Sequence, residues 1–331
     1  MPDPGMVKPE NPTRERNRRV QKNILELTLE RLQKLYEESP VRPGRLSRLA
    51  IKPHWNAVLG SNNECGLANN FLGIHSACGD RAENTRFLNL IGKSLLEIAD
   101  WGIHATDLQE RSIGIAAMSA LSQRFLGSSS IRNRGFLAQC WIPGDKLVRQ
   151  YPTIPRLVTK KDIVAVIGYG NEVRNLHGRC RELHVIDMHL KETFGTMIID
   201  KGIMYGPKDF VVHAEKEQEK VLGIADVVII SASTLVNNTF DDIIKYSSKA
   251  HLIGLYGPGG SFIPDVFFDR DIDFITSFHI ADSVRFSEDM INDHDMEFAV
   301  RTSQKQYMLM RPLAKTHGTP IHKMLRQATN L

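Results

Sequence analysis

Residues 225–245 read ADVVIISASTLVNNTFDDIIK. The apolar run Val227–Ile230 is rich in β-branched residues and too short for a helix of its own, which predicts a strand. Small polar residues follow, and from Phe240 apolar residues recur at helical spacing, with Asp241 and Asp242 suited to the positive end of a helix dipole. We therefore predict a strand, a polar turn and a helix. Such turns present hydroxyls, amides and backbone N–H groups at one edge of a sheet, where α/β proteins bind ligands.

The region around this stretch alternates between short apolar runs and helical segments. The predicted strands cover residues 163–167, 183–186, 210–212, 227–230, 252–255 and 274–275. This alternation is typical of βαβ units with right-handed crossovers and a parallel sheet. We therefore expect an α/β fold, with a Rossmann-like parallel-sheet domain over residues 151–331 that ends in helices, the clearest over Met296–Met310.

A smaller α+β domain is predicted over residues 46–150. Short apolar runs at 49–51 and 55–59 are typical of a hairpin. Two helices are expected next, one over 87–101 and one from Thr106 to Gly127, where Thr106 begins a capping-box pattern and Gly127 suits a helix end.

Residues 1–45 form an N-terminal extension. Between Arg14 and Glu38, apolar residues recur at helical spacing, and the opposite face mixes Arg, Lys and Glu. We interpret this segment as an amphipathic helix that packs on the body or on a neighbouring subunit, so a homo-oligomer is expected. A basic arm for an anionic partner is the alternative, but acids interleave with the bases.

Composition and charge narrow the class of protein. The 331 residues are 42% hydrophobic and 24% charged, as in an ordinary soluble protein, and no apolar run approaches the ~18–20 residues of a membrane helix. The net charge of +4 comes from residues 1–50, which carry 11 Lys and Arg against 7 Asp and Glu. The remaining residues are neutral overall, so the body of the protein offers no basic surface for nucleic acid. We therefore expect no nucleic-acid partner, and the lack of a long apolar run predicts no membrane partner. Four widely spaced cysteines and no secretory signal predict a cytoplasmic protein.

The first glycine turn of the predicted sheet resembles part of a dinucleotide fingerprint. It reads Gly168-x-Gly170-x-x-Val173, and Asp187 follows Gly168 by 19 residues at the end of the next strand. An acid at this position receives a ribose hydroxyl in dinucleotide-binding sites. One interpretation is a nucleotide-type cofactor, such as S-adenosylmethionine or a nicotinamide. The other is a glycine turn that binds no nucleotide.

Two further turns are expected at the same sheet edge. In one, Gly257, Gly259 and Ser261 are candidates for a backbone cradle. In the other, side chains of three residues are candidates for ligand hydrogen bonds or for turn geometry: Thr234, Asn237 and Thr239. Two such turns on neighbouring strands favour a binding cleft.

Metal-ligand residue types are scattered along the chain. The weak metal candidates are His54, Glu64, Cys65 and His279. None of them belongs to a zinc-finger spacing or to a helical HExxH. The same ligand types occur in His75-x-x-Cys78, Asp187-x-His189 and Asp293-His294-Asp295, and for each of these groups alone a core or surface role is favoured.

Three stretches carry a resemblance to a known family. They are Lys52–Ala68 (KPHWNAVLGSNNECGLA), Glu110–Leu121 (ERSIGIAAMSAL), and Ala225–Thr239 together with Gly254–Pro264. In sequence and order they resemble the putative heavy-metal-chelation family, a Rossmann-like domain of unknown function preceded by a domain similar to the enolase N-terminal fold. The resemblance implies a cleft between the domains that binds a small chelating or aromatic compound.

The chain departs from the family pattern at two places. Where the family loop usually reads Gly-Pro-Ser-Thr-Pro, this chain has Gly257-Pro258-Gly259-Gly260-Ser261, so backbone N–H groups or Ser261 must replace the hydroxyls. Where the small-residue helix usually carries Asn, this chain has Ser119.

These observations leave three hypotheses for function. In the first, the protein binds or processes a small metal-chelating metabolite, in metallophore or cofactor metabolism; Trp55 contributes from the smaller domain, and the candidate catalytic residues are Glu64, Cys65, His279 and Asp282. In the second, it is a biosynthetic enzyme that uses S-adenosylmethionine or a nicotinamide nucleotide. In the third, it is a non-enzymatic protein that docks a partner through its N-terminal helix.

Overall fold

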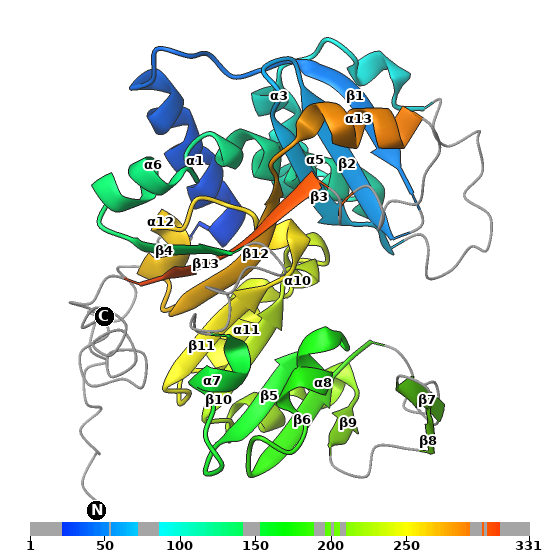
Figure 1. Cartoon of the computed structure of the whole chain (residues 1–331), viewed down its shortest axis with the longest axis vertical. Helices are drawn as coiled ribbons and strands as arrows, with labels where there is room; N and C mark the ends of the chain where they lie inside the picture. Colours follow the sequence, from blue (N-terminus) through cyan, green and yellow to red (C-terminus); the bar gives the residue numbers. More distant parts are fainter. Residues whose placement is uncertain are drawn as a thin grey trace, which may run out of the picture.

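A computed structural model describes residues 22–52, 54–71, 86–141, 153–188, 196–199, 202–205, 210–291, 300 and 303–311. It has two units (Figure 1). We call the first the antiparallel unit, which contains β1 to β3 and α3 to α5. The second is the parallel-sheet unit, which follows it in the chain.

The sheet of the parallel-sheet unit has eight strands in the described residues, in the order β4-β13-β12-β11-β10-β5-β6-β9. Six of them run parallel: β5 (Ile163–Ile167), β6 (Glu182–Ile186), β9 (Val211–His213), β10 (Val227–Ser231), β11 (Leu252–Tyr256) and β12 (Phe274–Ile280). Numbered along the chain, these six have the order 3-2-1-4-5-6 of doubly wound nucleotide-binding sheets. The predicted α/β fold with a parallel sheet is therefore confirmed.

Both faces of this sheet are buried, which explains the unbroken apolar runs in its sequence. In β10, Val228 and Ile230 enter one hydrophobic core, whereas Val227 and Ile229 enter the core on the opposite face. A strand covered on both sides needs apolar residues at every position.

Short helices and turns connect these strands. They are α7 (Ile154–Leu157), α8 (Asn171–Leu176), η5 (Glu215–Glu217), α9 (Gln218–Leu222), α10 (Ser233–Val236), α11 (Phe240–Tyr246), η6 (Pro258–Gly260), α12 (Asp265–Asp269) and α13 (Ser283–Ile291). A separate hairpin is formed by β7 (Thr196–Ile199) and β8 (Gly202–Tyr205).

The predicted helix over Met296–Met310 is wrong in its second half. Residues 296–299 lie outside the described residues, but Gln304–Met310 is strand β13, antiparallel to β12 and to β4 (Leu137–Trp141). Its residues from Tyr307 to Met310 are buried in succession, so the local sequence carries no two-residue alternation. Pairing on both sides determines the conformation here. Strand β4 lies within the range predicted for the smaller domain but belongs to this sheet.

The antiparallel unit is a three-stranded sheet packed against one long helix. Its strands are β1 (Leu46–Ile51), β2 (Trp55–Gly60) and β3 (Cys65–Asn69), and its helices are η2 (Leu88–Leu90), α3 (Leu95–Ala99), α4 (Trp101–His104) and α5 (Leu108–Gln123). The segment predicted as one helix over 87–101 is thus divided. Helix α5 is capped by Asp107, which accepts a 2.9 Å hydrogen bond from the Glu110 N–H, and not by Thr106.

Helix α1 (Ile24–Glu37) begins with a capping box between Asn23 and Glu26 and packs on the body of the protein. Its apolar face is buried in the core that both units share. The backbone N–H of Ile24 also donates to Asp241 at 3.2 Å, at the start of α11. The apolar face is therefore occupied by this chain itself. Helix α6 (Ser128–Asn133) lies near α1 (Figure 1). In the part of the chain that the structure describes, no helix has the length and apolar character needed to cross a membrane.

Candidate functional site

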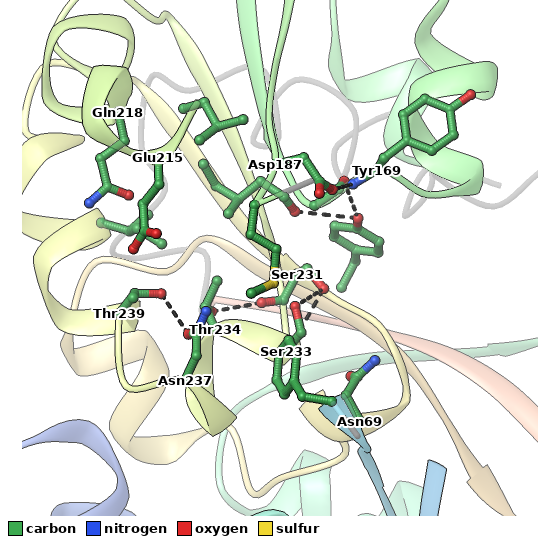
Figure 2. Close-up of a pocket in the computed structure, with 17 residues that line it drawn as sticks. Asn69, Tyr169, Asp187, Glu215, Gln218, Ser231, Ser233, Thr234, Asn237 and Thr239 are labelled. Atoms are coloured by element: carbon green, nitrogen blue, oxygen red, sulfur yellow. Dashed lines mark hydrogen bonds between the residues drawn. The ribbon is translucent and has the colours of Figure 1, made fainter. Parts of the chain in front are cut away.

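A cavity of about 210 Å³ lies at the carboxyl ends of the central parallel strands (Figure 2). It sits between β5 and β10, where the strand order reverses, and this switch point is the usual ligand site of doubly wound sheets. Its described lining is Asn69, Phe71, Ile167, Gly168, Tyr169, Ile186, Asp187, Met188, Glu215, Gln218, Ser231, Ser233, Thr234, Asn237, Thr239, Ile243 and Tyr256.

The turn after β5 forms one side of the cavity. Gly168 has φ +82°, which favours glycine, and a Cβ there would lie 3.1 Å from the Cβ of Ser231. The hydroxyl of Tyr256 donates to the carbonyl oxygen of Gly168 at 3.0 Å. Burial raises the pKa of the Tyr256 phenol, so this hydroxyl remains a protonated donor. The hydrogen bond from Tyr256 thus stabilises the glycine turn.

Two carboxylates contribute to the walls. Asp187 directly follows β6, is only 8% exposed, and accepts a 2.7 Å hydrogen bond from the Tyr169 N–H. Glu215 belongs to η5, which follows the edge strand β9, and its side chain is exposed. Gln218, at the start of α9, lies next to it in the cavity wall. Burial also raises the pKa of Glu172 in α8, which is not part of the described lining.

The segment between β10 and α11 supplies most of the hydroxyls. Thr234 donates to the Ser231 carbonyl at 2.7 Å, Ser233 to the Ser231 hydroxyl at 2.9 Å, and Thr239 to the Asn237 side-chain oxygen at 2.8 Å. The predicted turn contains the short helix α10, and the side chain of Thr239 does not cap α11. These polar side chains therefore stabilise the turn itself while they line the cavity.

The antiparallel unit closes the cavity with Asn69 and Phe71, at the end of β3. A buried polar network supports this end of the strand. Gln109 donates to Asn56 at 2.8 Å, Asn56 donates to Ser112 at 2.8 Å, and the Ser112 hydroxyl donates to the Asn69 carbonyl at 2.6 Å. The cavity is thus formed by both units.

Half of the ligand-binding residues predicted from the sequence line this cavity, namely Gly168, Asp187, Thr234, Asn237 and Thr239. Gly170 lies against the Tyr256 ring, where a Cβ would be 3.3 Å from the phenol oxygen. Trp55 begins β2 and packs in an apolar cluster with Leu59 and Cys65.

The loop over Gly257–Ser261 packs against protein and does not line the cavity. A Cβ on Gly259 would lie 3.7 Å from the Cα of Ala68 in β3. Ser261 is buried and accepts a 3.1 Å hydrogen bond from the Tyr307 hydroxyl. This loop therefore contacts β3, where the two units meet.

The candidate catalytic and metal residues do not converge on the cavity. Both carboxylate oxygens of Glu64 accept hydrogen bonds from backbone N–H groups, of Gly44 and Asn62, at 2.9 Å. Cys65 is fully buried, and burial raises the pKa of its thiol, which disfavours the thiolate that binds metals. Asp282 accepts from the Arg285 N–H at 2.9 Å at the start of α13.

The remaining candidates are equally dispersed. His54 is exposed beside β2, and His279 lies in β12, opposite Lys305 of β13. Within the described ranges, no group of three or more His, Cys, Asp or Glu side chains could hold a metal ion. The described residues therefore do not fit a bare heavy-metal ion held by protein ligands alone. His75, Cys78, His189 and residues 293–295 lie outside the described residues.

Several lining residues carried no signal in the sequence. Asn69, Phe71, Glu215 and Gln218 come from segments whose local pattern predicts only a strand end or a helix start. Tyr256 stands directly before a predicted glycine turn, but the reach of its ring across β10 depends on the assembled sheet.

Comparison with known proteins gives two family models with the same description, "Putative heavy-metal chelation". One matches residues 153–308 and the other residues 34–122. An uncharacterized protein from Methanocaldococcus jannaschii is 23% identical over 232 residues, which cover 70% of this chain and 76% of that protein.

Two solved structures share the fold. A DUF364-family protein of unknown function from Pyrococcus horikoshii aligns with a TM-score of 0.59 and 21% identity, over 86% of this chain and 99% of that one. Another, from Desulfitobacterium hafniense DCB-2, aligns with a TM-score of 0.59 and 17% identity, over 86% and 98%. At these identities the likeness concerns the fold alone.

Proposed function

This chain belongs to the family described as putative heavy-metal chelation, and from that premise we propose that it binds a small metal-chelating metabolite in the cavity between its two units. It acts there as a carrier or as an enzyme that processes the ligand. The observation that carries the proposal is the cavity at the switch point, which has both polar and apolar lining and to which both units contribute side chains.

The size and lining of the cavity support a small organic ligand. Its volume of about 210 Å³ is below the roughly 300–1,000 Å³ of pockets for drug-sized molecules. Hydroxyl, amide and carboxylate groups can orient such a ligand, and Phe71, Met188 and Ile243 provide apolar surface for its carbon skeleton.

The side chains that line the cavity favour a metal ion that is already bound to a chelator. The only acidic side chains in the described lining are Asp187 and Glu215, and the hydroxyls and amides around them are weak ligands for heavy metals. These groups are better suited to hydrogen bonds with the outer atoms of a chelate. The protein then recognises the chelator, and the chelator holds the metal.

Isothermal titration calorimetry tests this function. The probes are Ni²⁺ alone, and citrate, iminodiacetate and 1,3-diaminopropan-2-ol, each with and without Ni²⁺. We expect at least one chelator to bind, and Asn237→Ala to weaken that binding up to about tenfold, because Asn237 lines the cavity. The matched control is Asn175→Ala, an exposed Asn outside the cavity. Failure of every chelator to bind, or equal binding by both variants, would overturn the assigned site.

A nucleotide-type cofactor is the second candidate, favoured by the 3-2-1-4-5-6 strand order and by Asp187 at the end of β6. Against it, the phenol of Tyr256 lies against Gly170, close to where a pyrophosphate approaches the turn in such sites. Thermal-shift measurements with S-adenosylmethionine and NAD distinguish the two. A ligand at 100 times its dissociation constant stabilises by about 2.7 kcal/mol, so the absence of any shift argues against this candidate.

A further inference from the structure

We propose that the cavity selects a cationic ligand, namely a small chelator that carries protonated amines in addition to its metal-binding groups. This inference rests on the proposed function and specifies the chemical class of its ligand. Three properties of the described lining support it: the sign of its charges, the direction of its hydroxyl protons, and the absence of basic side chains.

The charges of the described lining are all negative. Asp187 and Glu215 line the cavity from the end of β6 and from η5 (Figure 2). Asp187 is almost completely buried, so its charge is poorly screened by solvent. A protonated amine in the cavity would gain from both carboxylates, whereas an anionic ligand would be repelled by both.

The described part of the wall contains no Lys, Arg or His. The chain as a whole is basic, with 42 Lys and Arg against 38 Asp and Glu. The acidic lining therefore differs in sign from the protein as a whole. Sites that bind phosphates or carboxylates usually present Arg or Lys, so the described residues of this lining suit neither class.

The hydroxyl groups add acceptors. The protons of Ser233, Thr234 and Thr239 point to acceptors inside the β10–α11 segment, at 2.7 to 2.9 Å. A ligand can therefore bind these three hydroxyls only by donating hydrogen bonds to their oxygen lone pairs. An ammonium group has three donors and no acceptor, and it matches this arrangement. The Asn237 oxygen already accepts from Thr239, so its NH2 group, like those of Asn69 and Gln218 in the same lining, can donate to a hydroxyl of the ligand.

A matched series of ligands tests the inference by calorimetry at low ionic strength, where charge effects are least screened. The probes are 1,3-diaminopropan-2-ol, isoserine and tartronate, which share a three-carbon 2-hydroxy skeleton and carry two positive charges, no net charge and two negative charges. We expect affinity to fall in that order, with the diamine at least about tenfold tighter than tartronate.

Substitutions in the lining test whether the preference for a cationic ligand arises in the cavity. Glu215→Gln and Asp187→Asn should each weaken diamine binding by about three- to tenfold, and Gln218→Lys should weaken it further while tartronate binding improves. Glu215 is exposed, so its variant tests the idea even if the buried Asp187 variant fails to fold. Glu219→Gln is the matched control, because Glu219 is an exposed acid on α9 outside the cavity lining.

The outcomes separate the two proposals. Tightest binding of tartronate, or a diamine affinity that Glu215→Gln and Glu219→Gln change equally, would overturn the cationic ligand class and leave chelate binding in place. If none of these probes binds, and neither citrate nor iminodiacetate binds with or without Ni²⁺, both the ligand class and the proposed function are wrong.

Discussion

The hydroxyl of Tyr256 donates a 3.0 Å hydrogen bond to the carbonyl oxygen of Gly168. Tyr256 ends β11 and Gly168 follows β5, so the side chain spans the intervening strand β10 at the switch point. The turn that carries the glycine is therefore fixed by a residue two strands away. Both residues line the candidate site.

Tyr256→Phe should destabilise the protein by about 1–3 kcal/mol, because the Gly168 carbonyl loses its donor while the aromatic ring keeps its packing. Urea denaturation measures the change. The comparison is Tyr246→Phe, on the partly buried Tyr246 of α11, which should change the free energy of unfolding by less than about 0.5 kcal/mol. Equal effects would show that the hydroxyl of Tyr256 contributes nothing specific to the turn.

Glu172→Gln should make the protein more stable at neutral pH and leave stability unchanged in acid. Burial raises the pKa of Glu172 above that of an unfolded glutamate, so the folded state binds its proton more tightly. The favourable contribution of the protonated acid is fully present below the unfolded pKa of about 4.3 and is lost as pH rises through the folded pKa. Glutamine carries no such charge to bury.

Chemical denaturation of both proteins at pH 4 and pH 7.5 measures this difference. The stability advantage of the variant should appear only at the higher pH. A constant difference at both pH values would mean that the Glu172 charge is not the cause.

Cys65 should resist alkylation in the native protein. Its side chain is fully buried, so a reagent cannot reach the sulfur. Burial also raises the pKa of the thiol, so the reactive thiolate is scarce. Cys180 is partly exposed and should react much faster with iodoacetamide at pH 8. Peptide mass spectrometry over a time course gives both rates. Rapid labelling of Cys65 would restore it as a candidate for metal binding.

Much of the parallel sheet can be predicted from the sequence, because the information is local. The β-branched run Val227–Ile230 is bounded by small polar residues, and β10 begins and ends within one residue of it. Parallel topology then brings every strand's carboxyl end to one edge. Gly168, Asp187 and Thr234 could be expected in one site for this reason alone.

The rest depends on contacts between distant segments. The sequence of β13 does not alternate between apolar and polar residues, because both faces of the strand are buried, and it therefore predicts a helix. The strand forms because it pairs with β12 and β4. Asn69 and Glu215 reach the cavity through the packing of their units, which no local pattern encodes. The sequence predicts that Gly259 approaches a ligand, and in the structure it lies at van der Waals distance from β3. Glycine permits both, and the sequence does not distinguish them.

Gly66→Ala should be among the most damaging substitutions in the antiparallel unit. A Cβ on Gly66 would lie 2.0 Å from the carbonyl oxygen of Ala116 and 2.3 Å from the N of Ala120, both in the backbone of α5. Strand β3 and the helix would have to separate, at a cost of about 3 kcal/mol. Gly127→Ala is the control, since nothing lies within 4 Å of its Cβ position. Equal midpoints of thermal unfolding for the two variants would contradict this close packing.

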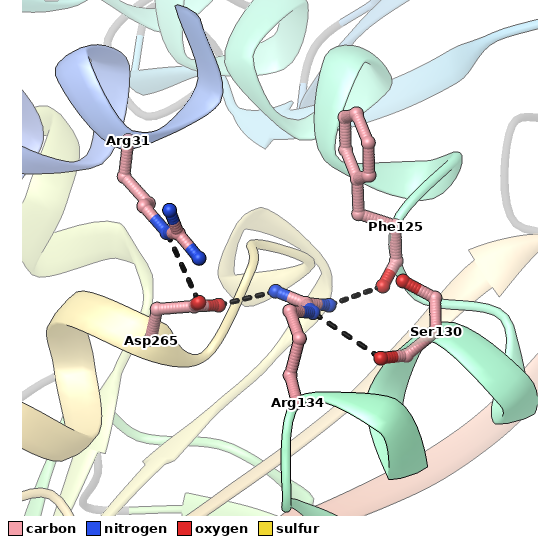
Figure 3. A network of polar contacts seen from close by, with 5 residues as sticks. All are labelled: Arg31, Phe125, Ser130, Arg134 and Asp265. Atoms are coloured by element: carbon pink, nitrogen blue, oxygen red, sulfur yellow. Dashed lines mark hydrogen bonds and ion pairs between the residues drawn. The ribbon is translucent and has the colours of Figure 1, made fainter. Parts of the chain in front are cut away.

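Asp265 joins three segments through one carboxylate, as Figure 3 shows. It pairs with Arg31 of α1 at 3.2 Å and with Arg134, which follows α6 and also donates to the carbonyls of Phe125 and Ser130.

Asp265→Ala should destabilise the protein by about 3 kcal/mol. The side chains of Asp265 and Arg134 are only 14% and 13% exposed, so the variant leaves the Arg134 guanidinium buried without its counter-charge. Arg31 is 31% exposed, and Arg31→Ala should cost about 1 kcal/mol or less. Urea denaturation ranks the two variants. Because Arg31 is the partner on α1, limited proteolysis of Asp265→Ala should first cleave around α1, and an unchanged cleavage pattern would mean that the other contacts of α1 hold this helix without Asp265.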